Sequence, residues 1–214
     1  MPEAAAHHES KNRLLDAAVR VFGAKGYSAT TLDDVCRSAE LTKGCFFYHF
    51  KSKEDLAVAS ASRFAEASRE VMAGAAYRAL ADPLDRLLGY VELRASLIRG
   101  DVGAYSCLLG TLVQEIHETH PVIRAACEQG ICDQASEVAT DIKLAKDLYA
   151  PEANWSAQSL GLYTQAVLQG SFILAKATGG RNAAVMCIEH LQRYLELLFT
   201  SSSKACGRDV EGAG

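Results

Sequence analysis

The stretch TTLDDVCRSAELTKGCFFYHFKSKEDL, residues 30–56, decides the fold, because it predicts two short helices joined by a tight turn. A threonine at its start can cap the first helix, and the two aspartates that follow lie in the positive first turn of that helix. A short break at Glu40–Leu41 precedes Thr42, a second good N-cap, and residues 43–50 form the second helix. We therefore expect a helix-turn-helix over about residues 31–49.

A longer helix precedes this stretch. Residues 11–24 carry apolar side chains at the i, i+3, i+4 and i+7 spacing of an amphipathic helix, and Gly26 can end it in a left-handed turn. After the helix-turn-helix, Ser52 followed by Asp55 resembles the capping box of another helix. The N-terminal quarter of the chain is therefore expected to form a three-helix unit.

The remainder of the chain is also helical in its periodicity, with Pro83, Pro121 and Pro151 at positions where a helix can begin. Strand-like alternation and internal repeats are absent from the sequence. The expected fold class is all-α, with about nine helices and a C-terminal helical bundle. Its helices are expected over about residues 53–80, 83–98, 104–119, 121–149, 156–178 and 182–200.

Composition narrows the function classes. The chain has 214 residues, of which 49% are hydrophobic, and a formal net charge of -4, which argues against a purely electrostatic binder of nucleic acid. Its seven scattered cysteines do not form a secreted disulfide framework, and we see no signal sequence or membrane-spanning stretch. A cytoplasmic protein with free thiols is expected.

The second helix of the motif has the composition of a DNA-reading element. Lys43 can contact a phosphate, Gly44 permits close approach, and the side chains of Tyr48 and His49 can donate hydrogen bonds in a major groove. Lys51 and Lys53 add positive charge at the end of this helix. The alternative is a polar corner of a helical protein, which Phe46 and Phe50, both expected in the core, support in part.

A longer set of residues resembles a known family. The pattern is similar to the N-terminal domain of tetracycline-repressor (TetR/AcrR) family regulators, and it covers about the first quarter of the chain. The matching residues are Gly26–Tyr27, Thr31, Val35, Ala39, Leu41–Gly44, Phe46, Tyr48–Phe50 and Ser52–Leu56.

The resemblance implies a homodimeric, DNA-binding transcriptional regulator, most simply a repressor that leaves palindromic operator DNA when a small molecule binds. It implies a DNA-binding domain over residues 1–55 and a ligand-binding and dimerisation domain over residues 56–201. Residues 202–214 are polar and contain glycine, so we expect them to form a disordered tail. The implied DNA contacts are Thr31, Thr42, Lys43, Gly44, Tyr48, His49 and Lys53.

Two residues depart from the family pattern. Glu40 stands where a glycine is usual in the turn, so it is expected to adopt a positive φ and to place a carboxylate near DNA. Phe47 stands where tyrosine is usual, so one hydroxyl contact to phosphate is lost. Individual contacts are therefore expected to differ while the fold is kept.

The last two expected helices are apolar around most of their circumference, which favours burial on two sides. One side suits the monomer core and the other a second subunit, as the resemblance implies for these two helices. Candidates for the ligand pocket are polar or aromatic residues on apolar faces: Tyr90, Arg94, Cys107, Gln114, His117, Trp155, Tyr163 and Gln165.

Other interpretations remain open at this level. A metal site would need His117, His120, Cys127 and Cys132, whose spacing is not a recognised zinc pattern. A redox pair would need the two cysteines together, but they are expected on different faces of one helix. The sequence contains no nucleophile–base pair, phosphate loop or cofactor motif, so neither an enzyme nor a bound cofactor is expected. A helical scaffold without a DNA role and a constitutive nucleoid binder are the competing hypotheses, and repressor and activator are not distinguished.

Overall fold

The computed structural model describes residues 2–205, and every regular element in this part of the chain is helical. The all-α prediction is thereby confirmed. The elements are α1 (Pro2–Lys25), α2 (Leu32–Ala39), α3 (Lys43–His49), α4 (Lys53–Ala73), the 3₁₀ helix η1 (Ala76–Ala79), α5 (Pro83–Ser96), α6 (Val102–Tyr105), α7 (Leu108–Ile116), α8 (Pro121–Tyr149), α9 (Ala157–Thr178) and α10 (Asn182–Ala205).

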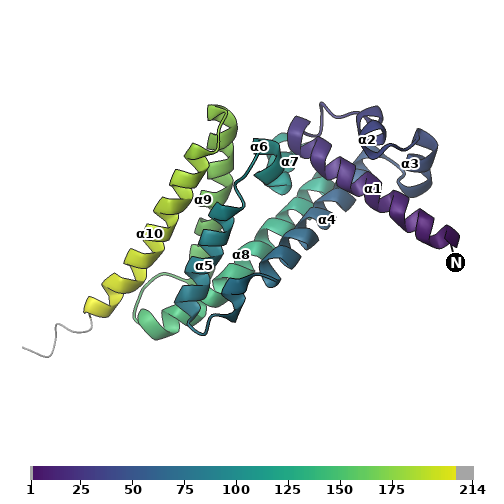
Figure 1. The fold of residues 1–214 in the computed structure, drawn as a ribbon. Helices are drawn as coiled ribbons and strands as arrows, with labels where there is room; N and C mark the ends of the chain where they lie inside the picture. Colours follow the sequence, from purple (N-terminus) through teal and green to yellow (C-terminus); the bar gives the residue numbers. More distant parts are fainter. Residues whose placement is uncertain (1, 206–214) are drawn as a thin grey trace, which may run out of the picture. The chain divides into compact units, whose positions relative to one another are not determined.

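The chain forms two compact units, each made of two segments. The first unit comprises residues 1–70 and 100–131. Within it, α1 lies against α2, α3, α6 and α7 (Figure 1). Its core is apolar, as the sequence pattern predicts, and includes the fully buried side chains of Leu14, Phe22, Phe46, Leu56 and Leu112.

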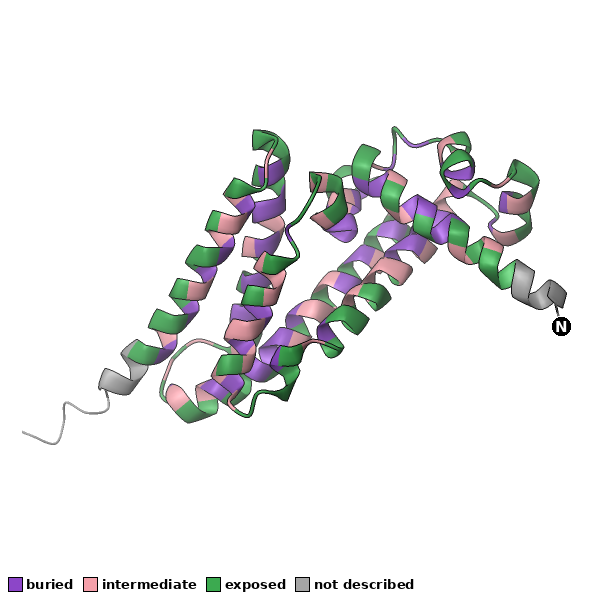
Figure 2. Cartoon of the chain, in the orientation of Figure 1, coloured by how far each residue is buried: buried purple, intermediate pink, exposed green. Residues whose placement is uncertain are grey.

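The second unit comprises residues 71–99 and the chain from Cys132 onward. Here α10 packs against both α9 and α5, and α5 packs against η1. Buried and exposed residues alternate along α9 and α10, so that each helix has one side in the core (Figure 2). Gly161 of α9 approaches the Ala135 carbonyl so closely that a Cβ would lie 2.5 Å from its oxygen, which explains a glycine inside this helix.

The division into units differs from the expected domains 1–55 and 56–201. The reason is that α4 and α8 are long helices, and each contributes its residues to both units. The expected tail begins inside α10, which continues to Ala205, and residues 206–214 lie outside the described part of the chain.

Several helix bounds also differ from the expectation. The first helix starts at Pro2 and not near residue 11, because no helix breaker separates its alanine-rich beginning from the amphipathic stripe. The expected helix 53–80 ends at Ala73, just before Gly74, and continues as η1. The expected helix 104–119 is divided into α6 and α7, because Ser106 and Cys107 are in extended conformations. Among the described residues, no helix is long and apolar enough to cross a membrane.

Candidate nucleic-acid interface

The start of α2 is fixed by Thr31, which forms the capping box expected of a threonine there. Its hydroxyl accepts a hydrogen bond from the Asp34 amide (3.1 Å), and its own amide donates to the Asp34 carboxylate (3.0 Å). The pKa of Asp34 is lowered to about 2. The hydrogen bond from the Thr31 backbone amide lowers it most, followed by those from the Thr31 hydroxyl and Lys25. Thr31 is exposed at the positive end of α2, where an anionic group is favoured.

The turn between α2 and α3 depends on Glu40. Its φ of 53° and ψ of 44° are left-handed, and it is the one non-glycine residue with positive φ in the described part of the chain. The prediction of a positive φ at this position is confirmed. The Glu40 amide donates to the Arg37 carbonyl (3.1 Å), and Arg13 from α1 donates to the Ala39 carbonyl (2.7 Å), which holds the strained turn in place.

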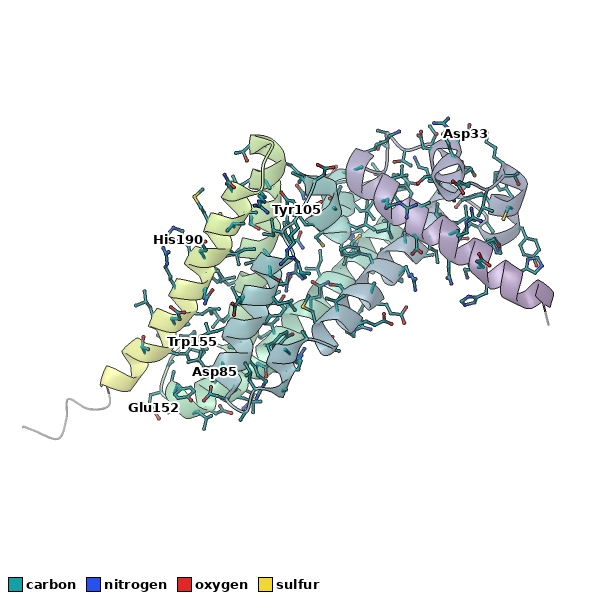
Figure 3. The ribbon with its side chains drawn as sticks, in the orientation of Figure 1. Asp33, Asp85, Tyr105, Glu152, Trp155 and His190 are labelled. Carbon is teal, nitrogen blue, oxygen red and sulfur yellow. The ribbon has the colours of Figure 1, made fainter. Side chains whose placement is uncertain are left out.

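The start of α3 presents three polar or small residues to solvent. Thr42 caps the helix by accepting from the Cys45 amide (3.2 Å). The Lys43 ammonium forms an ion pair of 2.9 Å with Asp33, which projects from α2 (Figure 3). A Cβ on Gly44 would meet only the Thr42 hydroxyl, at 3.7 Å, so the fold itself does not demand a glycine there.

Two aromatic rings project from α3 while two others anchor it. Phe46 and Phe50 are buried, as expected, and their rings pack together at 5.8 Å. Phe47 and Tyr48 are 57% and 66% exposed, which is unusual for side chains of this size. The exposed face of α3 therefore consists of an N-terminal lysine and glycine followed by an aromatic pair.

His49 occupies a different place from the one expected. Its Nε2 lies 2.8 Å from the Ser10 hydroxyl of α1, and its side chain is half-buried. Burial, followed by the nearby His7 and Lys11, lowers the pKa of His49. This side chain faces α1, so it fastens α3 to α1 and does not project from the outer face of α3.

The Lys53 side chain is also held by contacts within the protein. Its ammonium donates to the carbonyls of Tyr27 (2.8 Å) and Thr30 (2.9 Å) and lies 4.2 Å from the centre of the Tyr27 ring. Burial lowers the pKa of Lys53, although Glu115 acts in the opposite direction. Two of its three donors are therefore committed to the loop between α1 and α2.

The same loop is also held by Glu115 of α7. The carboxylate accepts from the amides of Tyr27 (2.6 Å) and Ser28 (2.8 Å). Burial alone would raise the pKa of Glu115, but these hydrogen bonds, together with the charge of Lys53, outweigh it and lower the value. Sequence spacing gave no signal of this clamp, because Glu115 is distant in the chain.

The N-terminal turns of α1 were also missed by the sequence pattern. The His7 ring stacks on the Tyr48 ring, with centroids 4.8 Å apart and planes inclined by 21°. His8 and Lys11 are exposed on the same helix. The alanine-rich run at residues 4–6 was the available signal that the helix extends this far.

The expected ligand-pocket residues fall into two groups. Cys107, Gln114 and His117 belong to the first unit, where Cys107 is buried and the other two are exposed. Gln114 donates to the Gly110 carbonyl of its own helix (2.7 Å). This unit therefore does not gather its three candidates around one cavity.

The other candidates belong to the second unit. Tyr90 and Gln165 come together in its interior, with 3.2 Å between the Gln165 amide nitrogen and the Tyr90 hydroxyl. Arg94 is half-buried on α5. Trp155 lies on the loop before α9 and packs against Phe199 (Figure 3). Tyr163 is half-exposed and packs against Tyr194 of α10, so it lies on an outer face of the unit.

That outer face is apolar along both helices. It carries large exposed side chains at helical spacing, and His190 projects beside them from α10 (Figure 3). The exposed large hydrophobic residues of α9 and α10 are Leu162, Tyr163, Ile173, Leu174, Met186, Tyr194 and Leu197.

The alternative metal and thiol sites do not gain support. Within the described residues, no group of three or more His, Cys, Asp or Glu side chains could hold a metal ion. Cys127 is buried and Cys132 is exposed, which agrees with the expectation that they lie on different faces of α8.

Comparison with known proteins identifies the N-terminal domain. Residues 14–59 match the family described as "Bacterial regulatory proteins, tetR family". The uncharacterised HTH-type transcriptional regulator YerO of Bacillus subtilis (strain 168) is 41% identical over 49 residues, which are 23% of this chain and 17% of YerO. IcaR of Staphylococcus aureus (strain Newman), the negative transcriptional regulator of the biofilm operon icaADBC, is 41% identical over 46 residues, 22% of this chain and 25% of IcaR. The chain thus matches no more than a quarter of the length of either relative.

Solved structures are similar over a larger part of the chain. A TetR transcriptional regulator from Chloroflexus aurantiacus J-10-FL matches with a TM-score of 0.78 and 24% identity, covering 90% of this chain and 96% of that one. Reduced E. coli NemR matches with a TM-score of 0.75 and 18% identity, covering 87% and 96%. These likenesses show the fold. Residues 14–59 thus match the TetR family of bacterial regulatory proteins, and the chain as a whole has the fold of solved TetR regulators.

Proposed function

We propose that this chain is a DNA-binding transcriptional regulator, and specifically a dimeric repressor that leaves its operator when a small molecule binds. The matched family consists of regulators and not of enzymes, and IcaR is named as a negative regulator, which supports repression here. The single observation that carries DNA binding is the exposed face of α3, with Lys43 and Gly44 at its start and Tyr48 projecting from it.

The arrangement favours direct DNA contacts by five of the expected residues. Thr31 and Thr42 are exposed at the N-termini of α2 and α3, where helix amides favour phosphate, and Lys43, Gly44 and Tyr48 lie on the outer face of α3. Phe47 lies beside Tyr48 and suits contact with a thymine methyl or a sugar. His49 and Lys53 act indirectly in this proposal, by holding α3 on α1 and the α1–α2 loop on α4.

Dimerisation is proposed through the apolar outer face of α9 and α10. Seven large, mainly apolar side chains are exposed on these two adjacent helices, and an exposed apolar cluster of this kind commonly marks a protein–protein interface. A second copy would cover this face and place two α3 helices on one palindromic site, about one helical turn apart. We propose an effector site in the second unit at Tyr90 and Gln165, two of the eight expected pocket residues, because these two side chains meet there.

The test is binding of purified chain to fluorescent DNA from upstream of its own gene, measured by mobility shift at increasing salt. Lys43→Ala and Tyr48→Ala are expected to abolish specific binding while the dimer, followed by size exclusion, stays intact. Lys143→Ala, which removes an exposed lysine from α8, is the matched control. Full binding by both α3 variants would overturn the assignment of α3, and salt-independent binding would contradict phosphate contacts.

Asp33→Asn is expected to change operator binding in the opposite direction. The Asp33 carboxylate neutralises Lys43 at 2.9 Å and adds negative charge beside the proposed DNA surface. Its removal is expected to strengthen operator binding by roughly threefold to tenfold at low salt. Unchanged or weaker binding would show that Lys43 does not contact phosphate.

A further inference from the structure

Two hollows of the second unit share one wall, the side chain of Tyr77. The first is a small, partly open cavity of about 10 Å³, lined by Tyr77, Leu87, Tyr90 and Asp141 among others, with room for about one water molecule. The second is an open groove of about 390 Å³ between η1 and α5, with a mostly apolar lining that includes Leu80, Gly89 and Leu93. Tyr77 therefore lies between a small cavity and a larger open groove.

The buried end of this region contains polar atoms without partners. The Tyr77 hydroxyl and the Gln165 side-chain oxygen are both inaccessible to solvent and have no hydrogen-bond partner, although these residues are only 7% and 2% exposed. The Gln165 amide nitrogen lies 3.2 Å from the hydroxyl of Tyr90, a residue that lines the small cavity. Buried polar groups are normally paired, so this pattern indicates a place for a missing partner.

Formal charge near the cavity is balanced. The buried Asp141 carboxylate is bound by Arg86 (2.8 Å) and Arg78 (3.4 Å), and Glu137 is a second carboxylate on the cavity wall. Two cations and two anions leave no net charge at the cavity, and Glu92, the charged residue on the wall of the groove, is exposed to solvent. An ion placed here would be desolvated without compensation, whereas a neutral molecule would not.

We propose that the groove and the cavity are two halves of one effector site, which takes a neutral, largely apolar molecule carrying a single hydrogen-bonding group. Tyr77 swings aside, the apolar body of the ligand fills the groove, and its polar group reaches Gln165 and the Tyr90 hydroxyl. This inference rests on the proposed function, because it names the chemical class of the small molecule that the regulator senses.

Packing, and not hydrogen bonding, holds the Tyr77 side chain, whose ring contacts Tyr90 and Arg78. Tyr77 lies on a four-residue 3₁₀ helix that has no side-chain cap, and no hydrogen bond holds its hydroxyl. Its Cβ packs on Gly89 so closely that a Cβ added there would lie only 2.6 Å away. Since η1 follows α4 directly along the chain, a shift of η1 is placed to reach the helix that begins at Lys53.

The first experiment compares three isosteric probes on the full chain by isothermal titration calorimetry: neutral 4-methylbenzamide, anionic 4-methylbenzoate and cationic 4-methylbenzamidine. We expect millimolar or tighter binding of the amide and at least about tenfold weaker binding of both ions. Gln165→Leu is expected to weaken amide binding by about tenfold, with Tyr163→Phe on the outer face of α9 as the control. No binding of the amide, equal binding of either ion, or unaltered binding by Gln165→Leu would each overturn the proposal.

Gly89→Ala tests the movable wall separately. The added methyl group forces Tyr77 from its place, so this variant is expected to bind the amide more tightly than the parent chain, even where its melting temperature falls. Loss of amide binding in a variant that still melts cooperatively would show that Tyr77 is a fixed part of the site. Operator binding is measured on the same samples: intact DNA binding without amide binding overturns only this inference, whereas absent DNA binding overturns the proposed function.

Discussion

The loop between α1 and α2 and the interior around Tyr77 differ in how well their polar groups are hydrogen-bonded. In the loop, the amides of Tyr27 and Ser28 are bound by Glu115, and the carbonyls of Tyr27 and Thr30 are bound by Lys53. Around Tyr77, two buried polar atoms have no partner. The contrast indicates that the loop that positions α2 is rigid. The interior that is proposed to bind a ligand lacks hydrogen-bond partners for two of its buried polar atoms.

The most damaging change to the rigid part is Gly26→Ala. Gly26 has a φ of +81°, and a Cβ there would lie 2.6 Å from the Glu115 carboxylate, so the substitution combines backbone strain with a clash. We expect the free energy of unfolding to fall by about 2–3 kcal/mol in urea denaturation. Gly44→Ala is the matched control, expected to raise it by about 0.5–1 kcal/mol, because that helical glycine is open to solvent. Equal effects of the two would contradict the clamp.

Glu115→Ala removes one side of the clamp directly. Two backbone amides lose their acceptor, so the free energy of unfolding is expected to fall by about 1–2 kcal/mol at neutral pH. Because the folded pKa of Glu115 lies below its ordinary value of 4.5, this contribution is present above that pH and is lost as pH falls through the folded pKa. Urea denaturation at pH 7 and pH 3.5 measures it, with Glu118→Ala, an exposed glutamate in the turn after α7, as the control. A variant as stable as the parent at pH 7 would remove the loop clamp from the account.

Acidification also tests how α3 is fastened to α1. Burial holds the pKa of His49 below the ordinary 6.5, so the unfolded chain takes up this proton first and stability declines as pH falls below that value. His49→Gln is expected to flatten the decline between pH 7.5 and pH 5.5, measured by urea denaturation against the parent chain. His8→Gln, an exposed histidine of α1, is the control. An identical pH dependence in parent and His49→Gln would mean that the Ser10–His49 contact does not form.

The smallest effects on the free energy of unfolding are expected in the interior around Tyr77. Tyr77→Phe deletes a hydroxyl that has no partner, so the free energy of unfolding should stay equal or rise by up to about 1 kcal/mol. Tyr90→Phe removes the hydrogen-bond partner of the Gln165 amide and should lower it by about 1 kcal/mol. Thermal denaturation of the two variants side by side checks the sign. A clear loss in Tyr77→Phe would show that its hydroxyl is satisfied in solution.

Local patterns predicted much of the first unit. Capping residues and apolar spacing act within one or two turns, so the sequence predicted α2, α3, the cap at Ser52 and the positive φ at Glu40. Tyr48 was expected to project from α3, and it is exposed.

The partners of Lys53 and His49 could not be predicted in the same way. A lysine after a recognition helix fits a phosphate as well as a carbonyl, and only the fold shows that Lys53 meets the carbonyls of Tyr27 and Thr30. The ligand candidates were chosen by residue type, which carries no information on spatial proximity. Of these candidates, the structure joins Tyr90 and Gln165 by a hydrogen bond, while Tyr77 was missed because its hydroxyl has no sequence signature.

The most direct test of DNA reading by α3 is a hydroxyl-radical footprint of the chain on DNA from upstream of its own gene. The account predicts two protected patches about one helical turn, roughly 10 base pairs, apart within a palindrome. Both patches should disappear with Tyr48→Ala and deepen with Asp33→Asn. Continuous protection without a palindrome, or a footprint that Tyr48→Ala leaves unchanged, would contradict it.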